Sequence, residues 1–243
     1  MTVQVYVWMQ TTNRRDASRT TESIERSDIG KDFQIVVDPY ERSFPQGYEA
    51  LQRWWFLAWY SQIQKAEAQG CSHILRLEDD IVVNEHILHN VTHWAALASP
   101  KFGVGTLFVP NHWESRPELM RIDPVTQEVF RSVRDVEGAQ GQVIPIAKAR
   151  EILQGVPAAM AQRERETGEP HPQPSFDWSV SRSAANLGLY TFVHLPALVD
   201  LHEGSLQSKI DQEQHTHGTS ADPSTHYWGS DSFNPHWRAR ENV

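Results

Sequence analysis

Short apolar runs and longer amphipathic segments follow one another along the first 110 residues. The apolar runs are rich in β-branched and aromatic side chains, which is typical of buried strands. They lie at residues 3–10, 33–38, 72–83 and 102–109. The amphipathic segments predict a short helix capped by Ser18 or Thr20, a long helix at 46–69 closed by Gly70, and a helix at 85–99. This order predicts an α/β fold with a mixed, mostly parallel sheet flanked by helices.

The second half of the chain has a less regular pattern. Residues 110–133 predict hairpins with a turn at Asp123-Pro124, and residues 138–147 predict a short strand. The elements expected after them are a helix ended by Gly155, a polar Pro-rich loop at 161–174, a capped helix ending at Gly188, and a strand pair around Pro196. No internal repeat or domain linker is visible, so we expect one domain over residues 1–243.

The composition narrows the class of protein. Apolar residues make up 39% of the chain and charged residues 22%, as in ordinary globular domains. No apolar run approaches the roughly 20 residues that a membrane span needs, and the N-terminal charges follow the first apolar run, unlike those of a signal peptide. The single cysteine, Cys71, allows no internal disulfide and favours a reducing compartment. A net charge of -9 argues against a general nucleic-acid binder. We therefore expect a cytoplasmic protein, or one of the host cytoplasm if its source is viral.

Three consecutive acids, Glu78, Asp79 and Asp80, follow the predicted strand "HILRL". Adjacent carboxylates repel each other, and burying them is costly unless a cation is nearby. Ligands of open α/β sheets bind beyond the carboxyl ends of the strands, where these acids and Asp38 are expected. Oxygen donors suit Mg²⁺ or Mn²⁺. The pattern therefore favours a divalent-metal site that also holds a phosphate-bearing substrate. The alternative is a solvated turn.

Three segments resemble one family. "LRLEDDIVVNE" resembles the D-x-D-type segment of GT-A glycosyltransferases, and is especially similar to its E-D-D version in N-acetylglucosaminyltransferases. "PALVDLHEGSLQS", residues 196–208, is similar to a late segment of those enzymes. "GAQGQVIPIAKAREIL", residues 138–153, is similar to their acceptor-side strand and helix. The resemblance covers roughly half of the chain in the expected order. In size, the chain is also similar to compact phage glycosyltransferases that modify DNA.

The resemblance implies a single GT-A, Rossmann-like domain that transfers a sugar from a nucleotide diphosphate, with a UDP-sugar as the expected donor. Residues 1–110 would form the nucleotide-sugar half, residues 111–210 the acceptor-side half, and residues 211–243 an irregular tail. Asp80 would bind Mn²⁺ or Mg²⁺ directly, and His202 would be the second protein ligand.

The remaining donor-binding residues follow from the same resemblance. Asp79 and Glu78 would assist the metal ligand, one of them through hydroxyls of the ribose or the donor sugar. The late segment would supply Gly204, where the backbone approaches the diphosphate, and Ser205 or Ser208 as hydrogen-bond donors. The loop after the first strand and two further positions would hold the nucleotide: Thr11, Thr12, Asn13, Arg14, Arg15, Asp38 and Arg53.

An inverting enzyme needs a base to take the proton of the acceptor hydroxyl. Asp177, at the start of the helix "FDWSVSR", is the candidate. Ser175 or Asp177 is equally suited to be the N-cap of that helix. Glu137 and Glu203 are rival bases, and a retaining enzyme would not need this base.

Other interpretations stay open. His86, His89 and His93 share one helical face and have a spacing that could bind Zn²⁺, although a polar helix face is the simpler interpretation. The chain could also be a sugar- or nucleotide-binding module without turnover, or a nucleotidyltransferase. Four classes of acceptor stay open: a glycan, a protein, a small molecule and the hydroxymethylated bases of phage DNA. For DNA, Trp237, Arg238 and Arg240 in the tail are candidate contacts.

Overall fold

The computed structural model describes residues 3–12, 16–38, 47–109, 119–136, 140–167 and 176–201. The side chains of residues 12, 38, 47–55, 167, 176 and 177 are not described. In this part of the chain an eight-stranded sheet has the order β2-β1-β3-β8-β5-β9-β7-β6. The strands are β1 (Val5–Thr12), β2 (Gln34–Asp38), β3 (His73–Leu77), β5 (Phe102–Thr106), β6 (Met120–Ile122), β7 (Val129–Arg131), β8 (Gly141–Pro145) and β9 (Tyr190–Val193).

The sheet is mixed. Strand β1 pairs in parallel with β2 and β3, β5 pairs in parallel with β9, and the pairings of β8 and β7 with their neighbours are antiparallel. Followed across the sheet, these pairings leave six of the eight described strands pointing the same way, with β7 and β8 reversed. The predicted α/β fold with a mixed, mostly parallel sheet is therefore confirmed.

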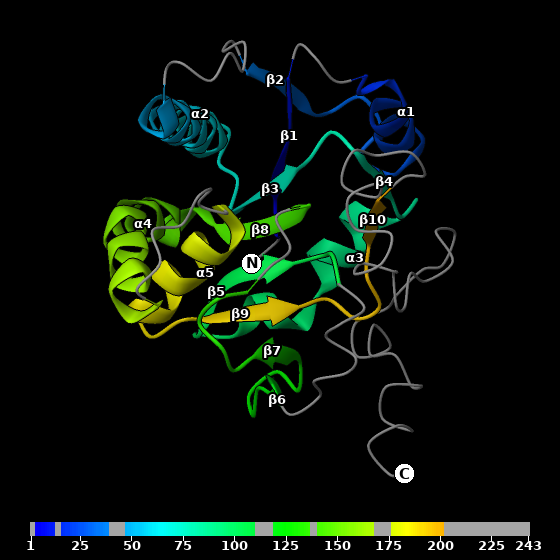
Figure 1. The fold of residues 1–243 in the computed structure, drawn as a ribbon. Helices are drawn as coiled ribbons and strands as arrows, with labels where there is room; N and C mark the ends of the chain where they lie inside the picture. The colour runs from blue at the N-terminus through cyan, green and yellow to red at the C-terminus, as the bar shows by residue number, and fades with distance from the viewer. Residues whose placement is uncertain are drawn as a thin grey trace.

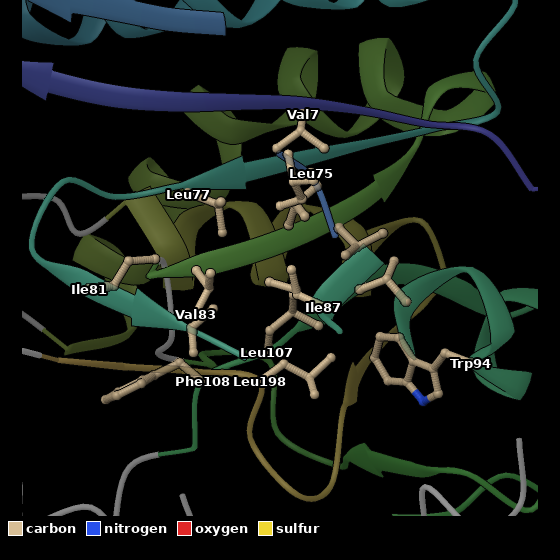
Figure 2. Close-up of a cluster of buried hydrophobic side chains, with 14 of the residues drawn as sticks. Val7, Leu75, Leu77, Ile81, Val83, Ile87, Trp94, Leu107, Phe108 and Leu198 are labelled. Atoms are coloured by element: carbon tan, nitrogen blue, oxygen red, sulfur yellow. The ribbon is translucent and has the colours of Figure 1, made fainter. Parts of the chain in front are cut away.

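Helices cover both faces of the sheet (Figure 1). The helices α2 (Gly47–Ala68), α4 (Ile146–Thr167) and α5 (Phe176–Asn186) share one apolar cluster with the sheet. The helices α1 (Ser18–Arg26) and α3 (Ile87–His93) share the other, and the 3-10 helix η2 (Ala95–Ala98) follows α3. Figure 2 shows part of this second cluster, to which Leu75 and Leu77 of β3, Ile87 of α3 and Trp94 belong. No helix in the described ranges is both long and apolar enough for a membrane crossing.

The run at 72–83 is not one strand. Strand β3 ends at Leu77, and Ile81–Val83 form a separate strand, β4, which pairs antiparallel with β10 (Val199–Leu201). The predicted strand pair around Pro196 is therefore wrong as a pair, because β9 belongs to the large sheet and β10 to this small one. The break between β3 and β4 coincides with the acid triplet.

Gly155 does not end its helix. Helix α4 continues through Gly155 and Pro157 to Thr167, so the first part of the loop predicted at 161–174 is helical. A Cβ atom at position 155 would overlap the hydroxyl of Ser183 on α5. The glycine is explained by close packing of the two helices. By contrast, Gly70 and Gly188 have positive φ angles of 72° and 73° beyond the ends of α2 and α5, as predicted.

Candidate active site

The acid triplet lies where the strand order of the large sheet reverses. From β1 the chain passes through α1 to β2 on one side, and then through α2 to β3 on the other side of β1. The chain therefore leaves β1 towards β2 and leaves β3 towards β5, in opposite directions across the sheet, while α1 and α3 on these connections cover the same face. Such a switch point is where open α/β sheets bind their ligands. Residues 78–80 follow β3 directly at this point.

Asp79 is held by hydrogen bonds from β1 and from α1, the helix that follows β1. Its side chain is 4% exposed, and the Thr11 hydroxyl of β1 donates to Asp79 Oδ2 at 2.9 Å. Thr20 Oγ1 of α1 lies 2.8 Å from the carbonyl oxygens of Asp79 and Ile81, and accepts a hydrogen bond from Ile81 N at 3.1 Å. One hydroxyl thus serves both sides of the turn. Thr11, which was predicted in the loop after the first strand, instead lies within β1, and its hydroxyl contacts the acid triplet from there.

Thr20 does not cap α1, and neither does Ser18. The helix starts at Ser18 with Ala17 as its N-cap residue, and that residue makes no side-chain cap. Ser18 N instead donates to Asp16 Oδ1 at 3.0 Å. The capping prediction was wrong because the hydroxyl of Thr20 is used for the acid turn, about 60 positions further along the chain.

Glu78 has a cationic partner that the sequence interpretation missed. Arg76 Nη2 lies 3.2 Å from Glu78 Oε1, and Arg76 Nε donates to Gln10 Oε1 at 3.1 Å. The side chain of Arg76 is 2% exposed and that of Glu78 is 26% exposed. Residues two apart in a strand point to the same face, so the Arg-x-Glu spacing was an available signal. One charge of the triplet is therefore balanced by the protein itself.

Asp80 is 5% exposed and directly precedes β4. Val83 pairs with Val199, and Ile81 pairs with Leu201, where β10 ends. His202, the predicted second metal ligand, is the next residue and lies outside the described ranges.

Within the described residues, no group of three or more His, Cys, Asp or Glu side chains could hold a metal ion. The donors that the turn contributes, Asp79 and Asp80, are carboxylates and have the chemistry that Mg²⁺ or Mn²⁺ prefers. The two carboxylates are therefore suitable ligands for such an ion, and the remaining ligands would have to be provided by other residues or by the substrate. The histidines of α3 form no such group: the rings of His89 and His93 stack at 4.1 Å, and His93 Nδ1 lies 2.8 Å from the backbone oxygen of His89. They support the interpretation as a polar helix face.

Several predicted residues have a described backbone only. Thr12 and Asp38 are register partners at the carboxyl ends of β1 and β2, Arg53 lies in α2, and Asp177 is the second residue of α5. Other predicted residues lie outside the described ranges: Asn13, Arg14, Arg15, Glu137, Glu203, Gly204, Ser205, Ser208, Trp237, Arg238 and Arg240.

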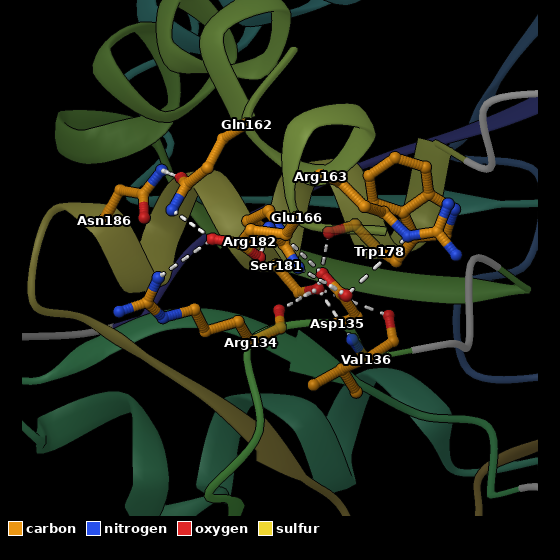
Figure 3. A network of polar contacts seen from close by, with 10 residues as sticks. All are labelled: Arg134, Asp135, Val136, Gln162, Arg163, Glu166, Trp178, Ser181, Arg182 and Asn186. Carbon is orange, nitrogen blue, oxygen red and sulfur yellow. Dashed lines mark hydrogen bonds and ion pairs between the residues drawn. The ribbon is translucent and has the colours of Figure 1, made fainter. Parts of the chain in front are cut away.

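A polar network holds residues 134–136 against α5 (Figure 3). Arg182 donates to both carboxylate oxygens of Asp135 at 2.6 and 2.7 Å and to Glu166 Oε2 at 2.6 Å. These hydrogen bonds lower the pKa of Glu166 and raise that of Arg182. Val136 N donates to Ser181 Oγ at 2.9 Å.

Gln140, a few positions after this network, is bonded to the acid triplet: its backbone oxygen accepts a hydrogen bond from Glu78 N at 3.1 Å. Val136, which is bonded to α5, and Gln140, which is bonded to Glu78, are only four positions apart in the sequence. Helix α5, which begins with Phe176 and Asp177, is linked to Glu78 through this short connection.

Comparisons with known proteins give weak similarities. No family model matches the sequence, and no curated protein was found to be similar. Among solved structures, a glycosyltransferase involved in the glycosylation of the major capsid of PBCV-1 has a TM-score of 0.44 and 16% identity, over 85% of this chain and 97% of that one. A197 from STIV has a TM-score of 0.37 and 10% identity, over 77% and 81%. A cytidylyltransferase from Leptospira borgpetersenii has a TM-score of 0.33 and 9% identity, over 62% and 63%. Because these similarities are weak, the function has to be inferred from the residues of the chain itself.

Proposed function

We propose that this protein is a metal-dependent glycosyltransferase that moves a sugar from a nucleotide diphosphate, with a UDP-sugar as the expected donor, to an acceptor hydroxyl. The observation that carries the proposal is the position of Glu78, Asp79 and Asp80 at the switch point of the sheet, held by Thr11 and Thr20 on one side and Arg76 on the other. The similarity of "LRLEDDIVVNE" to the E-D-D segment of GT-A glycosyltransferases supports it.

The pairing of β4 with β10 supports the assignment of His202 to the same site. Leu201, the last residue of β10, pairs with Ile81, the first residue of β4. In the sequence, His202 directly follows Leu201 and Asp80 directly precedes Ile81. Two segments distant in the sequence thus meet at the acid turn. Asp80 and His202 would hold Mn²⁺ or Mg²⁺, with Asp79 beside them.

The chemistry divides between the ion and the chain. A bound divalent ion would stabilise the negative charge that grows on the leaving diphosphate. The protein holds the acid turn rigid through Thr11 and Thr20, which lowers the cost of arranging charges during the reaction. Asp177 is our candidate for the group that takes the proton from the acceptor hydroxyl, because Val136 is bonded to Ser181 of α5 and Gln140, four positions later in the sequence, is bonded to Glu78.

The test is a donor screen with product identification. The protein is incubated with UDP- and GDP-sugars and Mn²⁺, and nucleotide products are measured with and without excess EDTA. Release of the nucleoside diphosphate, abolished by EDTA and by Asp80→Asn, is expected. Pyrophosphate as the product would identify a nucleotidyltransferase. Donor binding without any product would identify a binding module.

The acceptor is determined in the same experiment. Mass spectrometry of glycans, small-molecule alcohols and duplex DNA with hydroxymethylated bases shows which of them gains the mass of a sugar. A gain on the modified DNA alone would establish the DNA-modifying form of the proposal. A gain on glycans alone would contradict it.

A further inference from the structure

The face of the sheet that α2, α4 and α5 cover is apolar in its middle and becomes polar towards the carboxyl edge of β3. Ile74 of β3 and Ile144 of β8 are register partners on this face and belong to its apolar cluster. Two residues closer to the edge, the register partners on the same two strands are Arg76 and Gln142. Alternate residues of a strand share a face, so these two polar side chains lie next to each other above the apolar layer.

Gln142 is more deeply buried than its polarity predicts. It is 2% exposed, and its Oε1 atom has no hydrogen-bond partner among the described residues. Gln140, whose backbone oxygen accepts from Glu78 N, also has a buried Oε1 atom for which the described part of the chain provides no hydrogen-bond partner. A buried amide oxygen without a donor destabilises the folded protein. Such atoms therefore point to a ligand that supplies donors.

The groups around Gln142 define the chemistry of that ligand. The carboxylate of Glu78 is an acceptor, and so are the two amide oxygens. The nearby guanidinium of Arg76 already binds Glu78 and Gln10. A phosphate supplies only acceptors and does not match such a set. A sugar carries several hydroxyl donors on one rigid ring and does match it.

We propose that Gln142 and Glu78 accept hydrogen bonds from hydroxyls of the sugar that is transferred, with Arg76 as the residue that positions Glu78. This inference rests on the proposed function and adds to it the residues that select the sugar. It also assigns different roles to the two faces of the acid turn. Asp79 is bonded to Thr11 on β1, whereas Glu78 is bonded to Arg76, which is the register partner of Gln142.

The experiment compares binding of the nucleotide with binding of the nucleotide sugar. Calorimetry with Mn²⁺ measures the Kd of UDP, UDP-glucose, UDP-galactose and UDP-N-acetylglucosamine for the wild type, for Gln142→Met and for Gln154→Met. Gln154 is exposed on α4 and provides the matched control. We expect Gln142→Met to weaken the preferred UDP-sugar about tenfold and to leave UDP unchanged. Gln154→Met should change neither.

Deoxy donors test the same contact without relying on one variant. For the wild type, removal of one particular sugar hydroxyl should weaken binding by a similar factor, and for Gln142→Met that removal should have no further effect. An equal loss of UDP and UDP-sugar affinity, or no loss at all, would overturn the inference. If the wild type binds no nucleotide diphosphate or nucleotide sugar, the proposed function itself has failed.

Discussion

Arg76 and Glu78 form an ion pair of 3.2 Å that places a buried cation directly beside the three consecutive acids. The acid turn therefore carries part of its own charge compensation before any metal binds. Arg76 balances the charge of Glu78 alone, so the charges of Asp79 and Asp80 are the ones that a metal ion would balance.

Removal of Arg76 should destabilise the protein and make it more dependent on metal. Arg76→Met leaves Glu78 uncompensated beside two other acids, and we expect a loss of about 2 kcal/mol in the free energy of unfolding. Added Mn²⁺ should restore more stability to this variant than to the wild type. Urea unfolding with and without Mn²⁺ measures both effects.

Arg150→Met is the control for Arg76→Met. Arg150 forms a shorter, two-bonded pair with Glu67, at 3.1 and 2.6 Å, but the two side chains are 42% and 40% exposed. Exposed pairs contribute little, so this variant should leave stability nearly unchanged. Equal effects of the two substitutions would show that the Arg76 pair has no special role.

His202 should contribute to nucleotide binding through the metal. We expect His202→Ala to weaken the binding of UDP in Mn²⁺ and to have no effect on UDP binding in EDTA, because a metal ligand acts only when the ion is present. Calorimetric titrations under the two conditions provide the measurement. A loss of the same size without metal would assign His202 a structural role.

Asp177 should act in the transfer step more than in donor binding. Asp177 is the second residue of α5 and not its N-cap, contrary to one of the two capping candidates, so Asp177→Asn leaves the cap position unchanged and the melting temperature should stay close to that of the wild type. A lost general base lowers turnover by roughly 10²–10⁴-fold, so we expect at least a hundredfold lower rate with a nearly unchanged donor Kd. A normal rate would leave Glu137 or a retaining mechanism as the next hypothesis.

Glu128 should make stability depend on pH. Burial raises its pKa to about 7 from 4.5, partly opposed by the hydrogen bond that Trp94 Nε1 donates at 3.2 Å. The folded state therefore keeps the proton that the unfolded state loses. Its contribution to stability is complete below pH 4.5 and is lost as the pH rises through 7. Glu128→Gln retains an acceptor for Trp94 and should be more stable than the wild type by about 3 kcal/mol at pH 8, with little difference at pH 4.

Unfolding by urea at the two pH values measures this difference. Burial also lowers the pKa of His194, the residue after β9, to about 4. The stability that His194 contributes therefore depends on pH in the opposite sense, since it is lost as the pH falls. Because His194 is present in both proteins, its contribution cancels when Glu128→Gln is compared with the wild type. Glu151→Gln, on the exposed side of α4, serves as control. A gain of the same size at both pH values would contradict the prediction.

Local sequence patterns predicted the features that neighbouring residues determine. The periodicity located the strands and the helices, and Gly70 and Gly188 marked two helix ends correctly. The acid triplet was correctly expected at the carboxyl edge of the sheet, because its position depends only on the end of β3. Thr11 was expected in a loop for nucleotide binding, and it lies instead in β1 with its hydroxyl on Asp79.

Features that depend on distant contacts were missed. Gly155 resembles a helix terminator, yet it faces Ser183 on another helix. The hydroxyl of Thr20 resembles a cap, yet it bonds the turn after β3. The pairing of β4 with β10 joins segments more than one hundred positions apart and has no local signature. The partners of Arg76 and Gln142 required the register of β3 and β8.

The position of β8 between β3 and β5 has a consequence for the order of assembly during synthesis. Strands β3 and β5 are complete by residue 106, but the strand that joins them begins at Gly141, and the other neighbour of β5 begins at Tyr190. A nascent chain that has reached Val109 would therefore expose one unpaired edge of β3 and two of β5. Open edges of apolar strands invite pairing with other chains. The acid turn gains its bond from Glu78 to Gln140 only when β8 closes that gap, so the site is completed late.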